Sequence, residues 1–128
     1  MAHVLVVEDH PANMKLAVFL LENAHHQVTQ AVDAEEGIRL AREVRPDLIL
    51  MDIQLPGMDG LTAAHLLKTD AATQGIKIVA LTALAMSGDR ERILAAGCDA
   101  YIAKPLRYKD FLQVVSAMVD AGATPPAA

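Results

Sequence analysis

Short apolar runs alternate along this chain with longer amphipathic segments, and this alternation constrains the fold more than any other feature of the sequence. The runs typical of buried strands are 3–7, 27–31, 47–51, 76–82 and 99–103. The segments with apolar residues at helical spacing are 11–24, 33–44, 59–69, 87–96 and 108–121. A strand–helix unit that recurs in this way predicts a parallel sheet covered by helices on both faces.

Local signals mark several of the boundaries. Pro11 suits the first turn of a helix, where its missing N–H is not needed. Asp33 and Glu36 form a capping-box pattern at the start of the predicted helix 33–44, and Pro46 stops this helix. Gly97 suits the end of the predicted helix 87–96. Because crossovers between parallel strands are right-handed, we predict an α/β fold. It is a doubly wound sheet of five parallel strands in the flavodoxin-like order 2-1-3-4-5.

The composition argues against recognition of nucleic acid. The 128 residues carry 16 acidic and 11 basic side chains, for a formal net charge of −5, and aromatic residues make up 3%. An acidic surface repels phosphate backbones, and few aromatic rings are present on which bases could stack. No apolar stretch reaches the roughly 18 residues of a membrane-spanning helix. We therefore expect neither nucleic acid nor membrane as a partner.

The chain has the length of one domain and shows no linker or repeat. We expect residues 1–121 to form this domain and residues 122–128 (GATPPAA) to form a flexible tail, with no output domain. The single cysteine, Cys98, has no partner for an internal disulfide and is expected to be a buried, small apolar residue. A cytoplasmic location is the expectation that follows.

Polar side chains stand where four of the predicted strands end. Glu8 and Asp9 follow the first strand, Asp52 ends the third, Thr82 ends the fourth, and Lys104 follows the fifth. Ligands of open parallel sheets bind beyond the carboxyl ends of the strands, which share one edge. We therefore expect these side chains to meet there.

This set of side chains is suited to phosphoryl transfer. Three carboxylates at one edge repel one another, so one must take up a proton or the group must bind a cation. Mg²⁺ held by carboxylates and waters is the usual solution. Lys104 and Thr82 add a positive charge and a hydroxyl group for a tetrahedral oxyanion. Asp52 can then act as a nucleophile that forms an aspartyl phosphate.

The chain resembles the receiver domains of two-component response regulators over residues 3–119. The segments that carry the resemblance are VVEDHPANMKL, PDLILMDIQLPGMDGL, ALTA and AGCDAYIAKPL. They occur in the family's order and at the matching ends of the predicted elements. The segments MDIQLPGMDG and AGCDAYIAKP are most similar to single-domain regulators associated with the cell cycle (DivK-like) and to receivers of hybrid kinases.

The resemblance implies that Asp52 accepts a phosphoryl group from a sensor histidine kinase or a histidine phosphotransfer protein. It also implies that Asp9, Asp52 and the backbone carbonyl of Gln54 hold Mg²⁺ directly, and that Glu8 holds it through a water. Receivers often have Asp at the position of Glu8, so the geometry of this water can differ. The chemistry implied is self-catalysed acceptance and autodephosphorylation, and no separate enzymatic activity.

The phosphate contacts follow from the same resemblance. Lys104 pairs with the phosphate, while the hydroxyl of Thr82 and the amide of Ala83 donate to its oxygens. The Lys104–Pro105 peptide bond is expected to be cis, which an X–Pro bond permits at modest cost.

A signalling change is implied as well. Phosphate on Asp52 draws Thr82 inward, and Tyr101 rotates from the outside to the inside of the domain. This rotation changes the surface formed by the fourth helix, the fifth strand and the fifth helix, where downstream proteins dock.

Three other functions are less compatible with the residues. A phosphatase with an aspartate nucleophile typically has a second Asp two residues later, where this chain has Gln54. A flavin nucleotide would need a phosphate-binding loop after the first strand, where Glu8 and Asp9 place negative charge instead. The remaining alternative is a degenerate receiver that binds partners without phosphorylation, against which the complete residue set argues.

Some residues have structural explanations. Tyr101 can be an ordinary packing residue at a strand, and Gly57 and Gly60 are more typical of turn geometry than of chemistry. The histidines lack the ligand spacing of a zinc site. They are His3, His10, His25, His26 and His65.

Overall fold

The computed structural model describes residues 2–83 and 87–122. The elements alternate as predicted: β1 (His3–Val7), α1 (Pro11–Asn23), β2 (Gln27–Ala31), α2 (Ala34–Val44), β3 (Leu48–Asp52), α3 (Gly60–Thr69), β4 (Lys77–Thr82), α4 (Ser87–Ala95), β5 (Ala100–Ala103) and α5 (Tyr108–Gly122). Gly122 ends the last helix instead of starting the tail, and glycine is common where helices end. Residues 123–128, the rest of the predicted tail, lie outside the described residues.

The strands form one parallel sheet in the order β2-β1-β3-β4-β5, which confirms the predicted fold. The register places Val7 opposite Met51, Asp52 opposite Leu81, and Thr82 opposite Ala103. The carboxyl ends of β1, β3, β4 and β5 therefore lie at the same edge of the sheet.

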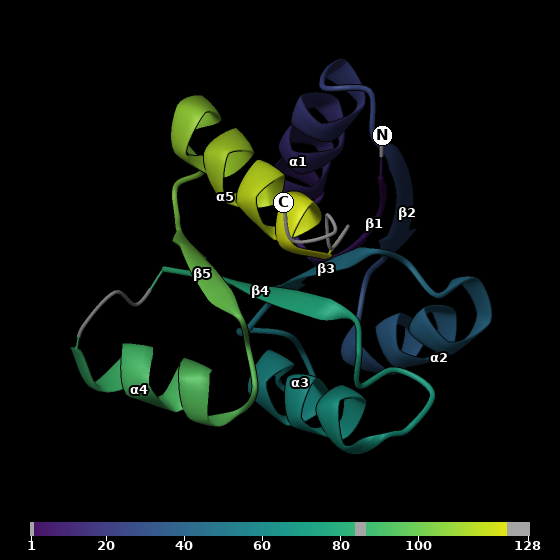
Figure 1. Cartoon of the computed structure of the whole chain (residues 1–128). Helices are drawn as coiled ribbons and strands as arrows, with labels where there is room; N and C mark the ends of the chain where they lie inside the picture. The colour runs from purple at the N-terminus through teal and green to yellow at the C-terminus, as the bar shows by residue number, and fades with distance from the viewer. Residues whose placement is uncertain (1, 84–86, 123–128) are drawn as a thin grey trace.

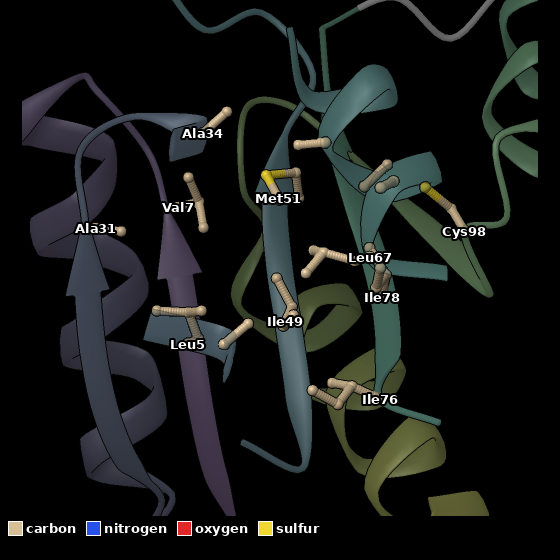
Figure 2. Close-up of a cluster of buried hydrophobic side chains, with 14 of the residues drawn as sticks. Leu5, Val7, Ala31, Ala34, Ile49, Met51, Leu67, Ile76, Ile78 and Cys98 are labelled. Atoms are coloured by element: carbon tan, nitrogen blue, oxygen red, sulfur yellow. The ribbon is translucent and has the colours of Figure 1, made fainter. Parts of the chain in front are cut away.

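Helices cover both faces of the sheet. Figure 1 shows α1 and α5 on one side and α2, α3 and α4 on the other. All five residues of β3 are buried, as expected for the central strand of a covered parallel sheet. Ile49 and Met51 belong to the cluster beneath α2, α3 and α4 (Figure 2), whereas Leu48 and Leu50 belong to the cluster beneath α1 and α5. The alternation follows from the period of two along a strand.

Two side chains fix the start of α2, and a turn of the backbone marks its end. Asp33 caps its start by accepting a hydrogen bond of 2.8 Å from the backbone N–H of Glu36. The Glu36 carboxylate reaches back to the N–H of Val32, at 3.0 Å, one residue earlier than in the usual capping box. At the other end the chain turns at Arg45, with φ of +46°, and Pro46 prevents a further helical turn.

A polar cluster ties the start of β5 to β4 and α3. The Asp99 carboxylate accepts hydrogen bonds from the Lys68 ammonium, at 2.9 Å, and from the backbone N–H of Ile78, at 2.8 Å. Lys68 also donates to the carbonyl of Ile76, at 2.8 Å. These hydrogen bonds fix the start of β5, the strand that leads to Lys104.

Cys98 lies beside this cluster and is buried, as predicted. Burial, reinforced by the charge of Asp99, raises the pKa of the Cys98 thiol to about 11. The thiol is therefore protonated and unreactive at neutral pH.

Within residues 2–83 and 87–122, no helix combines the length and the apolar character that crossing a membrane requires.

Gly60 sets the distance between α3 and the end of β3. A Cβ atom at this position would lie 2.1 Å from the carbonyl oxygen of Asp52 and 2.6 Å from Cα of Ile53. Both are backbone atoms, so neither can move away without a shift of the strand end. Glycine is therefore required here by close approach, whereas the turn geometry that the sequence suggested is found at Gly57, with φ of +74°.

We expect Gly60→Ala to destabilise the domain by about 1–3 kcal/mol, the usual cost of overpacking. The matched control is Gly75→Ala, because a Cβ atom there has no neighbour within 4 Å. Urea denaturation of both variants measures the difference in free energy of unfolding. Equal stabilities of the two variants would show that the contact with the Asp52 backbone does not constrain the fold.

Candidate functional site

Lys104 brings together side chains from three strands at the carboxyl edge of the sheet. Its ammonium lies 2.9 Å from Oε1 of Glu8, which follows β1, and 2.9 Å from Oδ2 of Asp52, which ends β3. Asp9 adds a third carboxylate, and its oxygens lie with those of Glu8 and Asp52 in one group. Four of the five residues that the sequence placed at strand ends, namely Glu8, Asp9, Asp52 and Lys104, therefore meet.

Asp52 is held in place by the chain around it. Its side chain is 3% exposed and its Oδ1 accepts a hydrogen bond of 2.9 Å from the backbone N–H of Gln54. The next residue, Ile53, donates its N–H to the carbonyl of Leu81, at 3.2 Å. One carboxylate oxygen thus faces a backbone donor and the other faces the ammonium of Lys104.

Glu8 is a buried carboxyl group, with 1% of the residue exposed. Burial is the largest cause that raises its pKa, and a hydrogen bond with the neighbouring Asp52 raises it further. The nearby ammonium of Lys104 and the hydrogen bond from the N–H of His10 act in the opposite direction without cancelling these effects. Glu8 therefore takes up a proton more readily than a free glutamate, mainly because it is buried, and the negative charge of Asp52 adds a smaller effect in the same direction.

Lys104 is kept charged by the same contacts. Burial lowers the pKa of its ammonium, but the hydrogen bond with Asp52 and the close negative charges of Asp52 and Glu8 outweigh burial and raise the pKa overall. One ammonium thus serves two carboxylates. The single positive charge of Lys104 does not balance all the negative charge of the group, because Asp9 adds a third carboxylate.

Two oxygens of the group are suited to a cation. Among the described residues, Oε1 of Glu8 and Oδ1 of Asp9 are buried atoms without a hydrogen-bond partner. Oε1 of Glu8 lies at ion-pair distance from Lys104, but the angles do not make a hydrogen bond. Buried oxygens in this state normally have water or an ion as a partner. The donor set, all carboxylates apart from His10, is the type that hard divalent cations prefer.

Thr82 and Ala83 lie next to this group on the neighbouring strand. Thr82 is 1% exposed, ends β4, and accepts the backbone N–H of Lys104 at 2.7 Å through its carbonyl. Ala83 is exposed and follows directly. The peptide bond between Lys104 and Pro105 is cis.

Tyr101 lies on β5, opposite Ala80 of β4. The side chain is half-buried and packs against the cluster beneath α2, α3 and α4. It is therefore neither fully inside nor fully outside, and its position is compatible with both the packing role and the switch role considered from the sequence.

His10 is the residue at this site that the sequence analysis missed. Its Nδ1 lies 3.4 Å from Oδ1 of Asp9 and 3.7 Å from Oε2 of Glu8. The spacing of the histidines relative to one another bears only on zinc sites built from several histidines. The informative signal was the position of His10 immediately after an acidic pair at a strand end.

A family model described as the response regulator receiver domain matches residues 4–116. The chain therefore belongs to the response regulator receiver domain family, which serves two-component signalling. It is 46% identical over 112 residues to the polar-differentiation response regulator DivK of Brucella anthropi, and 45% identical to DivK of Brucella ovis. Each comparison covers 88% of this chain and 91% of the relative.

Solved structures agree with this assignment. The receiver domain of a sensor histidine kinase from Pseudomonas aeruginosa, which has a magnesium ion coordinated in its active-site cleft, is 34% identical with a TM-score of 0.86. That comparison covers 93% of this chain and 98% of the other. A CheY-like receiver from Methanospirillum hungatei is 28% identical with a TM-score of 0.88, over 96% of this chain and 97% of the other.

We expect Glu8→Gln to stabilise the metal-free domain at pH 7.5. The pKa of Glu8 is raised above 4.5 by folding, so its favourable contribution is complete below the unfolded value and is lost as pH rises through the folded value. Glutamine stays neutral and keeps that contribution. Denaturation in EDTA should show a more stable variant at pH 7.5 and a much smaller difference at pH 4.5.

The control for this experiment is Glu22→Gln, which removes an exposed carboxylate from α1. It should leave the pH dependence of stability unchanged. Identical denaturation midpoints for wild type and Glu8→Gln at pH 7.5 would contradict the inference that an ionised Glu8 destabilises the metal-free site.

Proposed function

We propose that the domain accepts a phosphoryl group on Asp52 from a phosphohistidine of a sensor kinase or phosphotransfer protein, and then signals by binding other proteins. The observation that carries the proposal is the Asp52 carboxylate at the carboxyl edge of the sheet, 2.9 Å from the Lys104 ammonium. This arrangement combines a nucleophile with a positive charge that can stabilise the incoming phosphoryl oxygens. Membership of the receiver family supports it.

The phosphoryl transfer is a direct displacement. A carboxylate oxygen of Asp52 forms a bond to phosphorus as the P–N bond to the donor imidazole breaks, and the electron pair leaves on the imidazole nitrogen. Lys104 pairs with one phosphoryl oxygen, and the Thr82 hydroxyl and the Ala83 amide donate to others. Because the transition state is largely dissociative, positioning and charge supply most of the catalysis.

The carboxylates at this edge fit a divalent cation. In our proposal Asp9, Asp52 and the backbone carbonyl of Gln54 hold Mg²⁺ directly, while Glu8 holds it through a water. The buried oxygens of Glu8 and Asp9 that lack a hydrogen-bond partner support this assignment, as does the magnesium ion in the Pseudomonas receiver. When bound, Mg²⁺ supplies positive charge that offsets the repulsion between the carboxylates and the phosphoryl group.

We expect radiolabelled acetyl phosphate to label the wild type only when Mg²⁺ is present. The label should be stable to acid and labile to alkali, as an acyl phosphate is, and it should fall to background in Asp52→Asn. The control Asp120→Asn, an exposed carboxylate on α5, should be labelled like the wild type. An unlabelled but folded wild type would favour the degenerate receiver, which binds partners without phosphorylation.

The partner surface in our proposal is formed by α4, β5 and α5. A cavity of about 280 Å³ lies along this face, next to the site. It is lined by Tyr101, Ile102, Ala103, Lys104, Pro105, Arg107, Asp110 and Val114. Because Tyr101 and Lys104 both line it, a change at the phosphate can alter its shape. In our proposal, phosphate on Asp52 draws Thr82 inward and Tyr101 rotates, and this rotation alters the shape of the cavity.

We expect Tyr101 to report on phosphorylation. The chain has no Trp and two Tyr, so Tyr108→Phe leaves Tyr101 as its one strong fluorophore. Beryllofluoride with Mg²⁺, which mimics the phosphoryl group, should change its fluorescence, and Asp52→Asn should abolish the change. Fluorescence that stays constant while calorimetry shows beryllofluoride to be bound would refute the switch role.

A further inference from the structure

His10 differs in chemistry from every other side chain at the site. The four residues Glu8, Asp9, His10 and Asp52 each offer one atom to a group whose members lie within 4.8 Å of one another. Three of these atoms are carboxylate oxygens and the fourth is the Nδ1 nitrogen of His10. The His10 side chain is 67% exposed, so packing does not explain its position.

The distance between His10 and Asp9 leaves room for an ion that both residues bind. Metal–ligand bonds of about 2.1 Å place adjacent ligand atoms roughly 3.0 Å apart and opposite ones roughly 4.2 Å apart in an octahedral site. Nδ1 lies 3.4 Å from Oδ1 of Asp9, a direct ligand in the proposed function, and this distance is within the range. Oδ1 of Asp9 is also an oxygen without a hydrogen-bond partner.

We propose that His10 is an additional metal ligand, which makes this site bind nitrogen-preferring transition ions such as Ni²⁺ or Zn²⁺ in competition with Mg²⁺. The inference rests on the metal site of the proposed function and specifies which ions that site takes. Imidazole suits nickel and zinc, whereas magnesium prefers oxygen and retains its waters. A bound transition ion would occupy the carboxylates that the proposed function assigns to Mg²⁺, so the two ions would compete for the site.

A simple ion pair between His10 and the acidic pair makes the opposite prediction. In that case the imidazole would only add positive charge near the carboxylates. Its removal would then strengthen the binding of every cation. A ligand role instead predicts that removal weakens Ni²⁺ binding and leaves Mg²⁺ binding nearly unchanged.

The test is isothermal titration of the untagged chain at pH 7.5 with NiCl₂ and, separately, with MgCl₂. We expect His10→Asn to weaken Ni²⁺ binding by at least about tenfold, since even the outer partners of metal ligands alter affinity by about 10–100-fold. Mg²⁺ affinity should change less than about twofold, because magnesium has little preference for nitrogen. The other histidines of the chain can also bind nickel, so a variant of one of them is needed as a control.

The matched control is His25→Asn. His25 is exposed between α1 and β2 and has φ of +69°, a conformation that asparagine adopts readily. This variant should retain the wild-type Ni²⁺ affinity. Zinc titration followed by ¹⁵N resonances of the histidine rings should shift the Nδ1 signal of His10 and lose this shift in Asp9→Asn.

The outcomes separate the inference from the proposed function. If wild type and His10→Asn bind Ni²⁺ equally, or if the variant binds both ions more tightly, His10 is not a ligand and the inference is overturned. Binding of Mg²⁺ in the same titrations would leave the proposed function intact. If Ni²⁺ binds through His10 but Mg²⁺ does not bind at all, the inference stands and the proposed magnesium site fails.

Discussion

The ammonium of Lys104, shared between the carboxylates of Glu8 and Asp52 at 2.9 Å each, is the interaction on which the site depends. The two acids are buried, and buried carboxylates without a positive partner are strongly unfavourable. Lys104 reaches both because β1, β3 and β5 end at one edge of the sheet. The same contacts raise the pKa of Lys104 and keep it charged. Removing the ammonium would therefore disturb two strand ends at once.

The surrounding fold keeps these strand ends at fixed distances. Because Gly60 has no Cβ atom, the start of α3 can approach the backbone of Asp52 more closely than any other residue would permit. Asp99 fixes the beginning of β5 through bonds to Lys68 and to the N–H of Ile78. The close approach at Gly60 and the hydrogen bonds of Asp99 both fix backbone positions in the strands that carry the site. A rigid edge is useful here, because phosphoryl transfer relies on the placement of charge.

The sequence was sufficient to predict the sheet and the residues at its edge. Apolar periodicity, capping at Asp33 and the stop at Pro46 are local signals, and a parallel sheet places all its carboxyl ends together. It could not show that Gly60 faces the Asp52 carbonyl, or that His10 turns towards the acidic pair. Those facts depend on distances between elements and on side-chain rotation, which periodicity does not specify.

The charges of the site explain why a cation belongs there. Three carboxylates and one ammonium leave two negative charges without compensation, which one divalent ion would balance. Without an ion, the raised pKa of Glu8 shows that a proton is the available substitute. A phosphoryl group on Asp52 would bring further negative charge, so a proton on Glu8 could not replace the ion then. The imidazole of His10 adds no negative charge, so as a ligand it would change which ion the carboxylates accept and not how much negative charge the site carries.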